Sequence, residues 1–357
     1  MLHTLHFIKM KSPFKFLDAY TKADKDIFFG RDVEVEELYD RVFETNLVLL
    51  YGASGTGKTS IINCGLANMF ENTDWLPIHV RRKKNIIDSL HDCLDRYSVS
   101  QTYDKTEIKK KIKSIYLDHF KPIYLIFDQF EELFVLGSEP EQIVFFEVLR
   151  ELVEEGLQCK ILLSMREEYI AYLSAYEVII PTLFDNRQRI EKMGTLQLQE
   201  VIKGTTEAFG IAIEEVERVV DQIILKLRDP KAGVELSSLQ VYLDSMYRKA
   251  VGMKLPDEPV VFSPELIDET GQFEDVIEVF LREQVYQIEE ELKAKGSKVK
   301  GIPTTVLFSL VTEDGTKKAI EADSIYELLF KRKGITKSEI DYCIQRFQEL
   351  RILQEVT

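Results

Sequence analysis

One stretch decides the fold of this chain: Gly52-Ala53-Ser54-Gly55-Thr56-Gly57-Lys58-Thr59. Glycines at three of its positions let successive backbone N–H groups turn inward around an anion, in conformations that other residues resist. Lys58 then reaches the β- and γ-phosphates of a bound nucleotide, and the Thr59 hydroxyl can ligate Mg²⁺. The stretch therefore predicts a phosphate-binding loop, and all of its residues, together with Ser60, are candidate nucleotide contacts.

The sequence on either side of the loop provides the context that such a loop needs. A continuous apolar run at residues 46–51 precedes it, as expected of a parallel strand that is buried on both faces. A helix predicted at residues 58–69 follows it and directs its N-terminal dipole at the phosphates. The loop and its two neighbours together predict a P-loop NTPase domain.

An acidic residue on a second strand would complete the metal site. The apolar run at residues 122–127 ends at Asp128, whose carboxylate we expect near Thr59, holding Mg²⁺ through water. Hydrolysis also needs a group that orients or deprotonates the attacking water. Glu131 and Glu132 are the nearest carboxylates, and the sequence favours Glu132 slightly without deciding between them.

A third apolar run, at residues 160–165, ends at a basic residue. The guanidinium of Arg166 would sense the γ-phosphate or stabilise negative charge in the transition state. A salt bridge between Arg166 and Glu167 or Glu168 is the alternative interpretation, and the sequence leaves it open.

Strands and helices alternate over the first half of the chain. Besides the three apolar runs, weaker strands are predicted at residues 77–80 and 189–196. Helices are predicted at residues 32–45, 106–120 and 139–155. This alternation predicts an α/β fold in which helices cover both faces of a parallel sheet.

Beyond about residue 195 the pattern becomes helical. Amphipathic helices are predicted at residues 196–209, 213–227 and 236–250, and a linker with three prolines follows at residues 252–264. The last predicted helices lie at residues 273–295, 303–310, 323–331 and 336–350. The second half of the chain is therefore predicted to form helical domains after the sheet.

Composition excludes several classes of protein. The net charge of −15 and the pI near 5.0 argue against a broad electrostatic footprint for nucleic acid. The four cysteines are far apart in the sequence, so they predict neither a disulfide framework nor a zinc site and are typical of a reducing cytoplasm. No apolar run approaches the roughly 18 residues that span a bilayer. We therefore expect a cytoplasmic protein that does not bind membranes.

Four strings of the sequence occur in a recognisable order. They are Phe29-Gly30-Arg31-Asp32-x-Glu34, the phosphate loop, Asp128-Gln129-Phe130-Glu131-Glu132-Leu133-Phe134 and Met165-Arg166-Glu167-Glu168-Tyr169. In this order they resemble the STAND NTPases, most closely the bacterial novel STAND branch, which is related to AAA+ ATPases and to NB-ARC domains. The resemblance covers nearly the whole chain and implies that Phe29, Gly30 and Arg31 lie near the adenine of the nucleotide.

The resemblance also implies how the chain is divided. It predicts an N-terminal arm at residues 1–26, a P-loop NTPase domain at residues 27–195, a helical lid at residues 196–255 and a truncated winged-helix-like domain at residues 256–357. The family's lid has a proline that reaches the nucleotide. Here Ser237 or Ser238 stands at that point, so the contact between the lid and the β-phosphate is in doubt.

A winged helix suggests binding to DNA, but its charge argues otherwise. The expected recognition helix at residues 338–351 carries Glu339, Asp341 and Glu349 against Arg346 and Arg351, which is too acidic to grip phosphates well. We therefore expect nucleic acid not to be a partner. In the family that this chain resembles, the winged helix is an element for packing and switching.

The function expected from this resemblance is that of an ATP-driven molecular switch with slow hydrolysis. ADP would hold the lid closed, and exchange for ATP would allow self-association, with sensor and effector regions outside this chain. ATP is favoured over GTP because the sequence has no Asn-Lys-x-Asp string. Bacterial signalling or defence is the expected setting, by analogy alone.

Three other functions remain as alternatives. In an AAA-type motor, glutamate is expected where this chain has Gln129. A small-molecule kinase would need a substrate lid rich in arginine, whereas the basic residues after Arg166 are scattered. In a nucleotide-binding scaffold without hydrolysis, replacing both Glu131 and Glu132 would have no effect.

Overall fold

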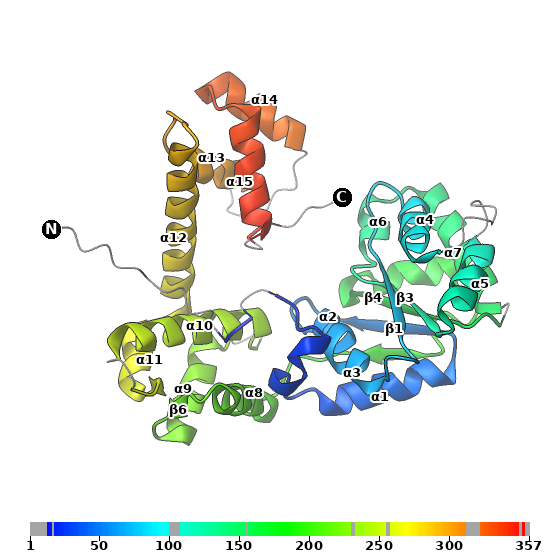
Figure 1. Cartoon of the computed structure of the whole chain (residues 1–357), viewed down its shortest axis with the longest axis horizontal. Helices are drawn as coiled ribbons and strands as arrows, with labels where there is room; N and C mark the ends of the chain where they lie inside the picture. Colours follow the sequence, from blue (N-terminus) through cyan, green and yellow to red (C-terminus); the bar gives the residue numbers. More distant parts are fainter. Residues whose placement is uncertain are drawn as a thin grey trace.

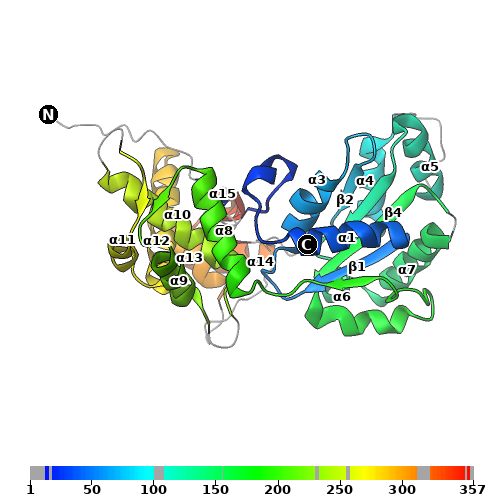
Figure 2. The same ribbon diagram turned by 90° about the horizontal axis from the view of Figure 1, so that it is seen from below.

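The computed structural model describes residues 13–15, 18–99, 108–154, 156–229, 233–254, 258–311, 322–349 and 352–353. Three groups of elements follow one another along the chain (Figures 1 and 2). An α/β part contains the main sheet, and a helical part lies beside it. A second helical group begins with a long helix and packs against its far end. Among the residues described, no helix has both the length and the apolar character needed to cross a bilayer.

Five parallel strands form the main sheet, in the order β2-β3-β4-β1-β5. They are β1 (Leu47–Gly52), β2 (Leu76–Val80), β3 (Ile123–Phe127), β4 (Cys159–Arg166) and β5 (Arg187–Arg189). The apolar runs before the phosphate loop, Asp128 and Arg166 form β1, β3 and β4, so all three sequence signals meet at the carboxyl edge of one sheet. The predicted parallel sheet is therefore confirmed.

Helices cover both faces of this sheet, because its strands alternate their side chains between two apolar cores. One face packs against α4 (Ile86–Tyr97), α5 (Ile108–His119), α6 (Glu132–Leu136), α7 (Glu139–Glu154) and the 3₁₀ segment η3 (Glu167–Tyr176). The other packs against α1 (Asp32–Glu44) and the helix after the phosphate loop. That helix comprises α2 (Lys58–Ser60), the π-helical turn η2 (Ile61–Leu66) and α3 (Ala67–Met69).

The fifth strand differs from the prediction. A strand was expected at residues 189–196, but β5 ends at Arg189 and the next helix begins at Thr195. The Ile190 amide still donates to the carbonyl of Tyr51, at 2.7 Å, and after it the chain leaves the sheet. The carbonyl of Glu191 then accepts from the Arg31 side chain instead of from a neighbouring strand, so the strand pattern stops there.

The helical part beside the sheet has its own apolar core. It contains α8 (Thr195–Ala208), β6 (Ala212–Ile213), α9 (Val216–Leu227), α10 (Leu236–Met253), β7 (Val261–Phe262) and α11 (Pro264–Thr270). We call this part the lid. The predicted linker at residues 252–264 is partly wrong, because its end pairs with β6 as β7 and starts α11. Ser263 caps α11 by accepting from the Leu266 amide at 3.3 Å.

The core of the lid extends beyond residue 255. Phe262 and Ile267 are fully buried in it, and Val276 of the following helix packs there as well. The predicted domain boundaries at residues 26, 195 and 255 remain predictions, and this packing favours a later end for the lid.

The last helical group consists of α12 (Phe273–Ala294), α13 (Ile302–Ser309), α14 (Ala322–Lys333) and α15 (Lys337–Glu349), which share a fourth apolar core. No strand occurs among the described residues after β7, so the winged-helix assignment stays a prediction. α15 corresponds to the expected recognition helix. It is tied to α12, because Tyr342 and Arg346 both donate to the carboxylate of Glu291, at 2.8 and 2.9 Å.

Candidate nucleotide-binding site

The phosphate loop joins β1 to α2 at the carboxyl edge of the sheet. Gly55 and Gly57 have φ values of 74° and 88°, in the left-handed region that glycine adopts without strain. Gly52 is needed for a different reason: a Cβ there would lie 2.3 Å from the carbonyl oxygen of Ile190. The glycines that predicted the loop are therefore required by its geometry.

Lys58 lies over the loop that precedes it. Its ammonium donates to the carbonyls of Gly52 and Ala53, at 2.8 and 2.9 Å. Burial lowers the pKa of Lys58, and the nearby carboxylates of Glu131 and Asp128 oppose that shift. The positive charge is therefore held at the place where the β- and γ-phosphates of a P-loop ligand bind.

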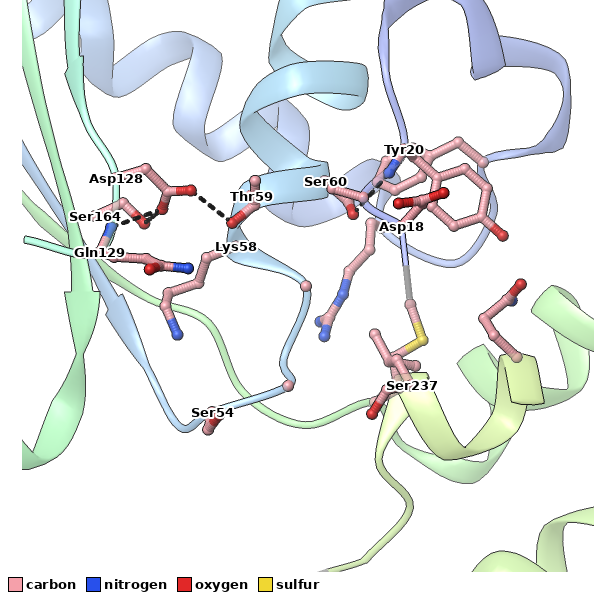
Figure 3. A pocket seen from close by; sticks show the side chains of 18 of the residues that line it. Asp18, Tyr20, Ser54, Lys58, Thr59, Ser60, Asp128, Gln129, Ser164 and Ser237 are labelled. Atoms are coloured by element: carbon pink, nitrogen blue, oxygen red, sulfur yellow. Dashed lines mark hydrogen bonds between the residues drawn. The ribbon is translucent and has the colours of Figure 1, made fainter. Parts of the chain in front are cut away.

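Asp128 gathers polar groups from the neighbouring elements (Figure 3). The Thr59 hydroxyl donates to its Oδ2 at 2.9 Å, while the Ser164 hydroxyl and the Gln129 amide donate to its Oδ1, each at 3.0 Å. The side chains of this cluster, those of Thr59, Asp128 and Ser164, offer only oxygen atoms as metal ligands. Oxygen ligands are the ones that Mg²⁺ prefers. These residues fit the expected metal ion, which Thr59 and Asp128 would hold.

Glu131 and Arg166 form a pair at the same edge. Glu131 accepts from both the backbone amide and the Nε of Arg166, each at 3.1 Å. Burial raises the pKa of Glu131, and the hydrogen bonds from backbone amides, with the positive charge of Arg166, oppose the shift. Both residues line the cavity described below. The alternative partner Glu167 instead pairs with Arg189, at 2.8 Å.

Glu132 points elsewhere. Its carboxylate pairs with Arg81, which follows β2, at 2.7 Å. Arg81 lines the cavity, whereas Glu132 does not. The geometry therefore favours Glu131, the residue that the sequence ranked second.

Phe29, Gly30 and Arg31 lie beside the phosphate loop, and Arg31 is bonded to it. Arg31 is 2% exposed, forms an ion pair with Glu34 and donates to the carbonyls of Thr56 and Glu191, each at 2.9 Å. It thus joins the phosphate loop to the chain that leads into the lid. Gly30 has a φ of 75°, and a Cβ there would press on α8.

Phe29 lies against the lid. A Cβ on Gly204 of α8 would lie 2.8 Å from its ring, so the ring contacts the helix where no side chain intervenes. Phe29 and Arg31 line the cavity, whereas Gly30 only shapes the backbone between them.

A single cavity of about 410 Å³ joins these groups. From the phosphate loop it is lined by Ser54, Gly55, Gly57, Lys58, Thr59 and Ser60, while Gly52, Ala53 and Thr56 form the loop behind this lining. Figure 3 shows Asp128 and Gln129 on one side, Tyr20, Asp18 and Ser237 on the other, and Lys58, Thr59 and Ser60 between them. The cavity thus runs from the sheet to the lid.

Sequence reasoning missed part of the lining. From the lid these residues are Val201, Leu236 and Gln240, from the segment just before α8 Met193, and from the arm Asp18, Ala19 and Tyr20. Gln240 could have been found, because it lies one helical turn after Ser237, which was singled out and does line the cavity. The arm residues carry no periodicity or motif that marks them.

Comparison with known proteins gives three structures of similar fold. The ORC1 protein of Aeropyrum pernix, in complex with DNA, is 15% identical, with a TM-score of 0.52 over 92% of this chain and 85% of that chain. The Walker-type ATPase PABY2304 of Pyrococcus abyssi is 13% identical, with a TM-score of 0.52 over 93% and 92%. The ORC2 protein of Aeropyrum pernix, in ADPNP–ADP complexes, is 12% identical, with a TM-score of 0.51 over 90% and 95%. At these identities the likeness concerns the fold alone.

A search of curated proteins found no match. A family model described as Novel STAND NTPase 1 matches residues 13–354, which is nearly the whole chain and includes the phosphate loop, Asp128 and the lid. The chain therefore belongs to the novel STAND NTPase 1 family of P-loop NTPases.

Proposed function

We propose that this protein is an ATP-binding, slowly hydrolysing molecular switch. The observation that supports it is the composition of the cavity. The phosphate loop, the lid and the arm all line the same 410 Å³ space, so a nucleotide that fills it contacts all three. A ligand shifts a conformational equilibrium only through contacts that differ between two states, and contacts to a movable lid meet that condition.

At the phosphate end, the backbone amides of the loop and the Lys58 ammonium would hold the β- and γ-phosphates. To reach them, Lys58 exchanges its bonds to the carbonyls of Gly52 and Ala53 for bonds to phosphate oxygens. Thr59 and Asp128 would hold Mg²⁺, which when bound neutralises charge on the phosphates. Ser164 and the Gln129 amide keep the Asp128 carboxylate in place.

Hydrolysis would use Glu131 as the base. Water attacks the γ-phosphorus, the bond to the bridging oxygen of ADP breaks, and the carboxylate of Glu131 accepts a proton from the water. Arg166 holds both carboxylate oxygens of Glu131. For Glu131 to act, Arg166 must first release it, for example by turning its guanidinium towards the γ-phosphate. This requirement gives a physical reason for slow turnover and for sensing of the γ-phosphate.

The wider role follows from the family resemblance. Exchange of ADP for ATP would open the lid and allow self-association, while regions or partners outside this chain provide sensing and output. We place this switch in the cytoplasm, in bacterial signalling or defence. A motor is less favoured, because the position after Asp128 is Gln129, where a glutamate is expected in an AAA-type motor.

Nucleic acid is not among the partners that we propose. The ORC1 protein of similar fold was solved with DNA. In this chain, however, Arg346 of α15 is already bound to Glu291 of α12, and the net charge is −15. Phosphate contacts depend on free basic side chains, which this helix offers sparingly.

Three measurements on the purified protein test the switch: the retained nucleotide, the turnover of added ATP and the mass in solution with ADP or ATP. Retained ADP, turnover far below about 1 s⁻¹ and a mass that rises with ATP are expected, since typical enzymes turn over at about 1–10³ s⁻¹. Fast turnover by a preformed ring would favour the motor instead.

A further inference from the structure

The N-terminal arm is anchored in the lid by an aromatic side chain. Phe14 is 5% exposed and belongs to the apolar core of the lid. Its ring lies 6.2 Å from that of Tyr247 on α10 and 6.4 Å from that of Phe262 on β7. Phe14 does not line the cavity. The arm is therefore fixed to the lid at Phe14 by burial of apolar surface, independently of any ligand.

A buried lid glutamine strengthens this anchor. The Oε1 atom of Gln240 accepts from the Lys15 backbone amide at 3.1 Å. Burial raises the pKa of the Tyr20 phenol, and the nearby Gln240 side chain opposes that shift. Gln240 lies on α10 and is 7% exposed. One lid side chain thus contacts the arm at two points along its course.

The same arm is tied to the helix after the phosphate loop. The Tyr20 amide donates to the Ser60 hydroxyl at 3.1 Å, as Figure 3 shows. The Asn68 side chain donates to the carbonyl of Lys22 at 3.0 Å, and the Lys22 ammonium donates to the carbonyl of Phe70 at 3.2 Å. The 3₁₀ segment η1 (Lys22–Ile27) then leads directly to Phe29. This second anchor belongs to the α/β part.

The arm therefore connects the two bodies between which the cavity lies. We propose that it is a latch, with Phe14 and Gln240 as the residues that hold the lid closed and limit the rate of nucleotide release. When α10 moves away from α2, either Phe14 must leave the lid core or Tyr20 must leave Ser60. Each route breaks buried contacts, so the latch opposes opening. The proposal rests on the proposed nucleotide switch and adds a specific determinant of exchange.

The latch also forms part of the wall of the cavity. Asp18, Ala19 and Tyr20 line the cavity between the two anchors, so a ligand there touches the latch directly. A nucleotide that shifts the lid would therefore act on the arm both at Phe14, through the lid core, and at Tyr20, through the cavity.

The test is the rate at which a fluorescent N-methylanthraniloyl-ADP leaves the full chain, measured by stopped flow on chase with excess ADP. Phe14→Ala and Gln240→Ala should each speed release roughly tenfold or more, because each removes a buried contact of the lid anchor. Phe14→Leu keeps an apolar side chain and should restore most of the slow release. The matched control is Gln199→Ala, which removes a glutamine hydrogen bond to Asp221 inside the lid without touching the arm.

The double variant distinguishes a latch from two unrelated effects. If Phe14 and Gln240 hold the same segment, removing both should speed release little more than removing one, because contacts that act as a unit are not additive. The latch would be overturned if the double variant sped release by the product of the two single effects. It would also be overturned if Phe14→Ala melted at the wild-type temperature and released the probe at the wild-type rate. If Phe14→Ala does not fold, Gln240→Ala decides alone, and release of the probe at the wild-type rate by that variant would overturn the latch. Failure of the wild type to bind the probe would instead overturn the proposed function and the latch together.

Discussion

At one end of the cavity, residues 54–60 form a continuous stretch, whereas the other end is collected from segments far apart in the sequence. We call the first, with Asp128 and Arg166, the phosphate end. The second, the arm-and-lid end, takes Tyr20 from the arm, Phe29 from the start of the α/β part and Val201 and Gln240 from the lid. The phosphate end rests on the rigid edge of a sheet, and the arm-and-lid end exists only while separate bodies stay together.

This difference assigns different tasks to the two ends. Chemistry needs groups held in fixed positions, and the phosphate end provides them at the ends of three strands. The switch that we propose needs contacts that can be made and broken, and the arm-and-lid end would provide them. Substitutions at the phosphate end should therefore change binding or turnover outright, while those at the arm-and-lid end should change rates of exchange and affinity more mildly.

The largest effect is expected at Glu131. Glu131→Gln keeps the shape of the side chain but removes its ability to accept a proton, so single-turnover hydrolysis of ATP should fall roughly 1,000-fold, within the usual range for a general base. Affinity for ADP should be kept. Glu132→Gln, on the adjacent residue bound to Arg81, is the matched control and should change the rate only slightly. If Glu132→Gln slowed hydrolysis more than Glu131→Gln did, Glu132 would be the general base instead.

Lys58→Ala comes second. It removes the charge at the β- and γ-phosphates, and ADP affinity measured by calorimetry should fall roughly 100-fold, the scale of a charge-assisted hydrogen bond. Lys113→Ala removes an exposed lysine on α5, away from the cavity, and should leave binding unchanged. A Lys58→Ala protein with wild-type affinity would show that the phosphate end is wrongly assigned.

Gly204→Ala probes the arm-and-lid end and should have a smaller effect. The added methyl would lie 2.8 Å from the Phe29 ring, so the ring must shift within the cavity wall. We expect ADP affinity to fall about fivefold, with hydrolysis of bound ATP unchanged. Gly252→Ala on α10 is the control, because a methyl there meets open space. A large loss of hydrolysis in Gly204→Ala would break the division of tasks.

The smallest effect expected is a displacement of the pH profile. Burial raises the pKa of Glu131, and a base acts only when deprotonated. Turnover should therefore fall on acidification at a higher pH than the ordinary glutamate value of about 4.3. Arg166→Ala removes a positive charge that lowers this pKa, so the acid limb should move to still higher pH. A limb that does not move would mean that another group governs it.

The sequence predicted the phosphate end well because its signals are local. The apolar runs at residues 46–51, 122–127 and 160–165 correspond to β1, β3 and β4 almost residue for residue, since strands buried on both faces are continuously apolar. Each functional side chain at this end directly follows such a run. Parallel topology then brings these side chains together without further information.

The choice between Glu131 and Glu132 could not be made in this way. Gln129, between Asp128 and the two carboxylates, has a φ of 53°, an uncommon value for a residue with a side chain, so the chain turns sharply before Glu131 and Glu132. No sequence pattern predicts that turn, because the surrounding contacts impose it. The favoured residue accordingly changes from Glu132 to Glu131 once the geometry is known.

The arm-and-lid end was mostly hidden from sequence analysis. Phe14 lies in a short segment that also contains Phe16 and Leu17, so nothing in the sequence singles it out, and its burial depends on α10 and β7, more than 200 residues later in the chain. The strands β6 and β7 are two residues long and carry no alternation to detect. Such contacts are purely tertiary, so propensity and pattern do not reveal them.

The tight contact between Gly52 and Ile190 has a mechanical consequence. It holds the chain that leads to the lid against the first residue of the phosphate loop, so the fulcrum of the lid rotation that we propose would lie beside this loop. The lever beyond it is long: α12 alone, with 22 residues, spans about 33 Å. A rotation of about 10° would carry the far end of such a rod through about 6 Å. A shift of a fraction of an ångström at the fulcrum can thus become a displacement large enough to uncover or bury a protein surface.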